Sequence, residues 1–184
     1  SAELFLNGKS RGVRIKGEKP KANAEFPFTT NTYYDVCANY RLTWLDVPYE
    51  PGELKAVAYR NGKKIGEAVV RTAGQTVALK LTPEKRELPP DGDSVVFVKV
   101  EAVDKDGVAD PLATNRVTFA VEGPGELVAV GNGNAHEMTS FAGTAYPLFY
   151  GRAAVVVRRR AGTTGTVTLT ARTGSLVSAK AEFP

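Results

Sequence analysis

The feature that most constrains the fold of this chain is an alternation of apolar and polar residues with a period of two. One phase of the stretch 95–102 holds apolar side chains, namely Val96, Val98, Val100 and Ala102. The opposite phase holds Lys99 and Glu101. Such alternation is typical of a β-strand with one buried face, because successive side chains point to opposite faces. It predicts a strand whose apolar face lies in a core.

The same alternation recurs along the chain. It groups Val117, Phe119 and Val121 on one face, then Val167, Leu169 and Ala171, then Val177, Ala179, Ala181 and Phe183. Asn7-Gly8 and Asn61-Gly62 favour two-residue hairpin turns, because both central residues of such turns need a positive φ. No stretch of a dozen residues has the apolar stripe of an amphipathic helix. The sequence therefore predicts an all-β fold of two consecutive immunoglobulin-like β-sandwich domains.

A boundary between the two domains is expected near Ala73-Gly74-Gln75. Residues 54–71 favour a closing hairpin before it, and residues 77–81 begin a new strand after it. We therefore predict domains at 1–74 and 75–184. The first domain is short enough that we expect it to lack its opening strand. Its segment from Lys16 to Asn39 has little pattern and is interpreted as a long loop or an insertion.

Composition limits the classes of partner. The net charge of +4 comes from 24 Lys and Arg residues interleaved with 20 acidic ones, which argues against a nucleic-acid surface. No apolar run approaches the roughly 20 residues that cross a bilayer, so no membrane insertion is expected. Cys37 is the one cysteine, which excludes an internal disulfide and a cysteine zinc cluster; it is interpreted as a small buried residue. The chain opens at Ser1 directly into an apolar strand pattern, as a piece of a longer protein would.

An active site is not expected within these residues. Glycoside hydrolysis needs two carboxylates in a cleft, whereas nearly all acids here fall on polar strand faces or in turns. A (β/α)₈ catalytic barrel takes about 250 residues and needs alternating helices. The nucleophile motif Gly-x-Ser-x-Gly is absent and His136 is the one histidine. We therefore predict no catalytic residue, no metal site and no cofactor.

Three local motifs have both a functional and a plainer interpretation. The Gly/Asn-rich segment 131–137 suits anion binding by backbone N–H groups, but consecutive turns explain it better. Residues 104–107 begin like a calcium loop without its later ligands, and are interpreted as a hairpin turn. The basic run Arg158-Arg159-Arg160 must alternate between faces of a strand, so a solvated strand end or an interdomain contact is favoured.

Aromatic residues offer the best candidates for binding. Trp44 has the flat face that suits a sugar ring, although a core position is the favoured interpretation. Tyr33 and Tyr34, with Tyr40 and Tyr49 as neighbours in sequence, are the better candidates for exposed contacts. Tyr33, Tyr34 and Trp44 together form the hypothesis of a carbohydrate-binding site.

Several phrases of the sequence resemble a known family. The stretches 3–10, 42–44, 47–59 and 71–74 are similar to the region after the catalytic barrel in bacterial beta-galactosidases of glycoside hydrolase family 2. The stretches 81–83, 98–107, 115–119, 121–125 and 130–133 resemble the C-terminal immunoglobulin-like domain of those enzymes. The segment from Lys16 to Asn39 fits the family pattern poorly.

The resemblance implies a function for the parent protein and a supporting one for this chain. The parent would hydrolyse β-galactosides and be periplasmic or extracellular. Its catalytic glutamates belong to the barrel, so none is assigned here. The catalytic barrel of the parent chain is the implied partner, with a glycan as a further candidate. A carbohydrate-binding module and an adhesin-like stalk of immunoglobulin domains remain the alternatives.

Overall fold

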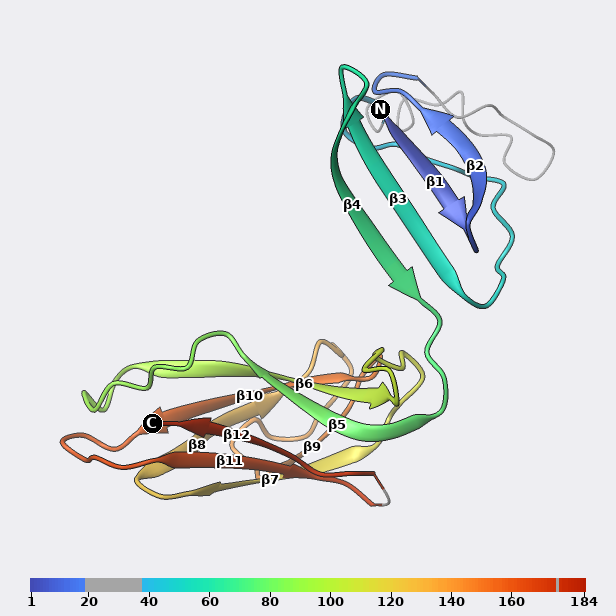
Figure 1. Cartoon of the computed structure of the whole chain (residues 1–184). Coiled ribbons are helices and arrows are strands. Elements are labelled where there is room, and N and C mark those ends of the chain that lie inside the picture. The colour runs from blue at the N-terminus through green and yellow to red at the C-terminus, as the bar shows by residue number, and fades with distance from the viewer. Residues whose placement is uncertain (19–37, 175) are drawn as a thin grey trace. The chain divides into compact units, whose positions relative to one another are not determined.

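The computed structural model describes residues 1–18, 38–174 and 176–184. The chain divides into two compact units, Ser1–Thr72 and Ala73–Pro184. Both are built from antiparallel strands, which Figure 1 labels in chain order. The all-β sandwich class predicted from the alternation is confirmed. No helix in the described part of the chain is long and apolar enough to cross a membrane.

In the first unit the described residues form a four-stranded sheet in the order β2-β1-β3-β4. Its strands are β1 (Ala2–Leu6), β2 (Lys9–Arg14), β3 (Glu53–Arg60) and β4 (Lys63–Arg71). Asn7-Gly8 joins β1 to β2 and Asn61-Gly62 joins β3 to β4, with positive φ at all four residues. Both predicted hairpin turns are therefore confirmed. One face of β1 is buried through Ala2, Leu4 and Leu6.

In the second unit the described residues form two four-stranded sheets. The first has the order β5-β6-β10-β8, from β5 (Thr76–Pro83), β6 (Val95–Asp104), β10 (Arg152–Arg159) and β8 (Gly125–Gly131). The second has the order β12-β11-β7-β9, from β12 (Ala179–Phe183), β11 (Val167–Arg172), β7 (Arg116–Glu122) and β9 (Ala145–Pro147). The two sheets lie as facing layers (Figure 1).

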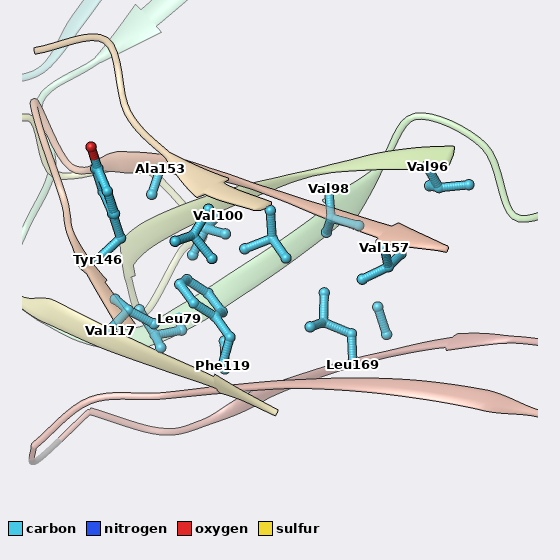
Figure 2. Close-up of a cluster of buried hydrophobic side chains, with 14 of the residues drawn as sticks. Leu79, Val96, Val98, Val100, Val117, Phe119, Tyr146, Ala153, Val157 and Leu169 are labelled. Carbon is cyan, nitrogen blue, oxygen red and sulfur yellow. The ribbon is translucent and has the colours of Figure 1, made fainter. Parts of the chain in front are cut away.

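The core of the second unit fills the space between its two sheets. Val98 and Val157 of the first sheet and Leu169 of the second point toward one another there (Figure 2). All three side chains are fully buried. Burial of apolar surface of this kind contributes roughly 25 cal/mol per Å². The predicted inward phase of β6, β7 and β11 is confirmed, but Val177 is 66% exposed and precedes β12 instead of joining its core face.

Within the basic run 158–160, Arg160 is exposed as a solvated strand end would be, but Arg159 is not. Arg159 is only 3% exposed, at the end of β10. Its guanidinium donates to the backbone carbonyl of Leu88 at 2.7 Å and to that of Pro184 at 2.6 Å. It also donates to the carbonyls of Gly165 and Phe183. Because side chains alternate along a strand, Arg159 points to the inner face of the sheet. There, carbonyl groups from two loops and from β12 accept the hydrogen bonds that water would accept from an exposed guanidinium.

Candidate functional site

The outer face of the first sheet of the second unit carries a shallow apolar hollow. Alternation along β6 turns Phe97 outward, and in the sheet register Phe97 lies opposite Val156 of β10, which lies opposite Ala129 of β8. In the next row, Lys99 of β6 lies opposite Ala154 of β10, which lies opposite Gly131 of β8. Ala129, Ala154 and Gly131 are small, so the two rows leave a depression of about 630 Å³. This sheet face was not singled out by the sequence, because its lining comes from strands far apart in the chain.

Aromatic side chains form the walls of the hollow. Phe97, Phe141, Phe149 and Tyr150 all line it. Phe141 and Tyr150 are 61% and 63% exposed, which is unusual for large aromatic residues. The Phe149 and Tyr150 rings meet edge to face, with centroids 4.5 Å apart. Ring faces are thus held beside an apolar floor, an arrangement suited to hydrophobic contact.

Gly131 allows Phe141 to lie over the sheet. A Cβ atom on Gly131 would stand 3.3 Å from Cδ1 of Phe141, tighter than an ordinary contact. The Phe141 carbonyl also accepts a hydrogen bond from the backbone N–H of Val130 at 2.8 Å. The Phe141 ring also stacks on buried Tyr146, with centroids 5.9 Å apart. Phe141 is therefore exposed yet anchored by both backbone and ring.

The segment leading to Phe141 is a series of turns. Oδ1 of Asn132 accepts from the N–H of Asn134 at 2.8 Å, and Oδ1 of Asn134 accepts from the N–H of His136 at 3.0 Å. Oε1 of Glu137 accepts from the N–H and the hydroxyl of Thr139, and these hydrogen bonds lower the pKa of Glu137. The interpretation of 131–137 as turns is confirmed, but none of these residues has the positive φ that was expected of its Gly and Asn residues. Side-chain oxygens that bond to nearby N–H groups hold the loop in one shape.

A buried carboxylate organises the charges at one end of the hollow. Glu101 is 6% exposed, and its oxygens contact Nζ of Lys99 at 3.0 Å and Nε of Arg152 at 3.2 Å. Burial opposes its ionisation, but the hydrogen bonds and charges of Lys99 and Arg152 outweigh burial and lower the pKa of Glu101. Glu101 was predicted on a polar strand face, and it is covered because two long cationic side chains lie over it.

The carboxylate of Asp104 belongs to a turn. Asp104 ends β6 and accepts hydrogen bonds from the N–H groups of Asp106 and Val108, both at 2.9 Å, which confirms the predicted hairpin turn at 104–107. Within residues 1–18, 38–174 and 176–184, no group of three or more His, Cys, Asp or Glu side chains is placed to hold a metal ion. No acid is among the residues that line the hollow.

Of the predicted carbohydrate-binding residues, the described part of the chain contains only Trp44. Trp44 is half-buried in the first unit, and its Nε1 donates to the carbonyl of Gly12 at 3.0 Å. Tyr33 and Tyr34 lie outside the described residues, as do Cys37 and most of the segment from Lys16 to Asn39. Tyr40 and Tyr49 are 83% and 79% exposed. Glycan binding at Tyr33, Tyr34 and Trp44 therefore stays a prediction.

Both units match known families. Residues 79–182 match glycoside hydrolase family 2 C-terminal domain 5, which spans most of the second unit. The chain belongs to glycoside hydrolase family 2. Residues 1–66 match a domain of unknown function (DUF4982). The resemblance stated from the sequence is confirmed, and the family description identifies the second unit as a C-terminal domain.

Relatives of this family 2 chain are larger glycosidases. It is 35% identical over 174 residues to the beta-galactosidase BoGH2A of Bacteroides ovatus, covering 95% of this chain and 18% of that protein. It is 31% identical over 157 residues to a putative beta-glucuronidase of Formosa agariphila, covering 85% of this chain and 13% of that protein. The chain thus spans less than a fifth of the length of either relative.

Solved structures agree with the sequence relatives. A glycosyl hydrolase family 2 member from Bacteroides cellulosilyticus superposes with a TM-score of 0.76 at 30% identity, over 100% of this chain and 22% of that one. A beta-glycosidase from Bacteroides vulgatus gives a TM-score of 0.80 at 26% identity, over 99% of this chain and 21% of that one. In both structures, the aligned region is about a fifth of a longer chain.

Proposed function

We propose that this chain is a non-catalytic accessory region of a family 2 glycosidase that hydrolyses β-galactosides. The observation that carries the proposal is the match to BoGH2A, in which 95% of this chain is aligned with only 18% of a beta-galactosidase. A domain that belongs to the family but occupies so small a share of its relatives supports the chemistry of another part of the protein. The partner is the catalytic barrel of the parent chain.

The chemistry of the described residues supports the non-catalytic part of the proposal. Glycoside hydrolysis requires a carboxylic acid and a second carboxylate facing one cleft. The carboxylate of Glu101 forms ion pairs with Lys99 and Arg152. The carboxylate of Asp104 accepts hydrogen bonds from backbone N–H groups. The hollow has aromatic walls and no acidic lining residue. An apolar surface of this kind suits packing and does not suit proton transfer.

Deleting this region from the full-length enzyme tests the supporting role. The expected result is an enzyme that retains hydrolysis of a chromogenic β-galactoside but unfolds at a lower temperature. Loss of a packed accessory domain removes buried apolar surface without touching the reacting groups. A truncated enzyme with the unfolding midpoint and proteolytic resistance of the intact one contradicts a supporting role.

We propose a periplasmic or extracellular location for the parent enzyme, from the family resemblance. Fractionation of the source bacterium, with an antibody against this chain, tests the location. Signal in the periplasmic or surface fraction is expected, and signal confined to the cytosol contradicts it.

Glycan binding is a separate hypothesis that rests on Tyr33, Tyr34 and Trp44. Calorimetry of the chain against a panel of β-linked oligosaccharides tests it. Binding that is abolished by Tyr33→Ala supports it, and no heat at millimolar glycan contradicts it.

A further inference from the structure

We propose that the hollow over β6, β10 and β8 is the docking surface for an apolar projection from another domain of the same family 2 enzyme chain. The proposal rests on the accessory role proposed above and adds the place and the chemistry of the contact. Four observations carry it: a strained aromatic residue, exposed rings, internally paired polar groups and the size of the hollow.

Tyr150 occupies a backbone position that a tyrosine seldom takes. The described part of the chain has three two-residue turns with the same pair of positive φ angles: 50° and 78° at Asn7-Gly8, 50° and 74° at Asn61-Gly62, and 48° and 71° at Tyr150-Gly151. Two of them carry Asn-Gly, the pair that such a turn prefers. The third carries a bulky ring where the left-handed conformation costs free energy. Strain retained in this way points to a role for the side chain beyond the turn itself.

The turn presents the Tyr150 ring beside the hollow. Phe149 and Arg152 close the turn with reciprocal backbone hydrogen bonds of 2.9 and 3.1 Å. A Cβ atom on Gly151 would lie 2.0 Å from the carbonyl oxygen of Asp110, so this turn is seated tightly on a neighbouring segment. Tyr150 is nevertheless 63% exposed, and Phe97 is 50% exposed. Large rings held rigidly in solvent are the residues that most often anchor protein contacts.

Of the polar side chains that line the hollow, Lys99, Arg152 and Asn132 have partners within the chain, whereas the exposed Tyr150 hydroxyl has none among the described residues. Lys99 and Arg152 both contact Glu101. Nδ2 of Asn132 donates to the carbonyl of Pro147 at 2.9 Å, and its Oδ1 accepts from Asn134. Sugar binding needs polar groups that pair with hydroxyls, whereas an apolar side chain needs only a dry surface. The internal pairing therefore favours an apolar protein segment over a glycan.

The size of the hollow favours a partner in the same chain. Its lining comprises 14 residues, fewer than the roughly 20–30 per side of a stable interface between free proteins. A contact between covalently linked domains works with a smaller surface, because the link supplies a high effective concentration. In the relatives from Bacteroides ovatus and Bacteroides cellulosilyticus, the aligned region is 18% and 22% of one longer chain. The proposed occupant of the hollow is therefore a segment from the remainder of the same enzyme chain.

Hydroxyl-radical footprinting of the full-length enzyme, compared with the isolated chain, tests the docking surface. Phe97, Phe141 and Tyr150 are expected to be oxidised several-fold more slowly in the enzyme. Val177, exposed elsewhere in the same unit, serves as the reference for solvent-accessible oxidation within the isolated chain. Unchanged oxidation of all three rings overturns the proposal.

Tyr150→Asn separates docking from folding. The substitution restores the Asn-Gly turn, so the isolated chain is expected to unfold at an equal or higher temperature. The full-length enzyme is expected to unfold at a lower temperature, because the ring is lost from the contact. Phe97→Thr, which keeps strand propensity, is expected to act in the same direction on the enzyme. Val177→Thr is the control, with no specific loss in the enzyme.

The outcomes distinguish this proposal from the accessory role. If deletion of the region destabilises the enzyme but Tyr150→Asn and Phe97→Thr do not, the docking surface is wrong and the accessory role stands. If deletion also has no effect, both are wrong. Protection of the rings in the isolated chain that grows with its own concentration, or on addition of a galacto-oligosaccharide, overturns the proposal in favour of a second copy or a glycan.

Discussion

The carboxylate of Asp104 accepts a hydrogen bond from the backbone N–H of Gly74 at 2.7 Å. Asp104 ends β6, and Gly74 lies just before β5, so one side chain fixes the path of the chain into the first strand of the second unit. The same carboxylate closes the turn after β6 through Asp106 and Val108. A buried acceptor with several donors loses more when altered than an exposed one.

Asp104→Asn is expected to lower stability and to speed hydrogen exchange at the Gly74 amide. The new NH₂ group cannot accept a hydrogen bond, so one set of donors loses its partner. Amide exchange followed by NMR checks this. Asp106→Asn, on the same turn but with a side chain 68% exposed, is the control and should leave Gly74 unchanged. Equal exchange at Gly74 in both variants contradicts the anchoring role.

Stability is expected to fall in acid partly through Asp104. The N–H groups of Gly74, Val108 and Asp106 lower the pKa of Asp104. Because the pKa of Asp104 is lower in the folded than in the unfolded protein, its ionised carboxylate stabilises the fold above the unfolded pKa of about 3.9. This stabilisation is lost as the pH falls through the folded pKa.

Asp91 offers a titration with a definite midpoint. The hydroxyl and N–H of Ser94 and the N–H of Asp93 lower the pKa of Asp91 to about 2. Carboxyl-detected NMR is expected to show a midpoint near that value. Ser94→Ala removes the hydroxyl donor at 2.6 Å and should raise the midpoint toward the ordinary aspartate range. A midpoint of the wild-type residue in the ordinary range would show that this turn does not form.

Gly52→Ala is expected to destabilise the first unit by more than about 1 kcal/mol, because alanine is strained at a positive φ. Gly52 has a φ of 134°, and a Cβ atom there would lie 1.9 Å from Oδ1 of Asn7. That oxygen accepts from the N–H of Glu53 at 2.8 Å, so the clash also disrupts the entry into β3.

Gly66→Ala is the matched control for Gly52. Gly66 lies in β4, and a Cβ atom there meets nothing within 4 Å. Urea unfolding of both variants checks the difference. Equal midpoints for the two variants contradict the packing around Asn7.

Arg159→Met is expected to lower the free energy of unfolding by about 3 kcal/mol, because it leaves several buried carbonyls without a donor. Arg160→Met, next in sequence but exposed, should change stability little. Denaturant unfolding of both variants provides the comparison. A loss at Arg160 as large as that at Arg159 contradicts the role of the buried guanidinium.

The sequence predicts the strands well because a period of two is a local property. Val96, Val98 and Val100 were assigned to one face from their spacing alone, and all three are fully buried. The Asn-Gly turns were equally readable, because few other pairs tolerate two positive φ angles. Alternation also sends Arg159 to the inner side, but its acceptors lie 71 and 25 residues away in sequence, at Leu88 and Pro184, and no local pattern shows them.

The candidate surface was not predictable for a related reason. Periodicity places Phe97 outward, but it does not reveal that Ala129, Ala154 and Gly131 leave space beside it. Those neighbours follow from strand order, which pairs β6 with β10 and β10 with β8. Tyr150-Gly151 carries no turn signal, since tyrosine is rarely found at that position.

The central proposal is that this family 2 chain supports the hydrolysis carried out by another part of its enzyme and does not perform it. The most direct test is the release of nitrophenol from a chromogenic β-galactoside by the purified chain of residues 1–184, beside the full-length enzyme at equal molar concentration. Release by the chain is expected to equal that of a buffer blank. Turnover well above the blank that co-elutes with the chain during purification would contradict it.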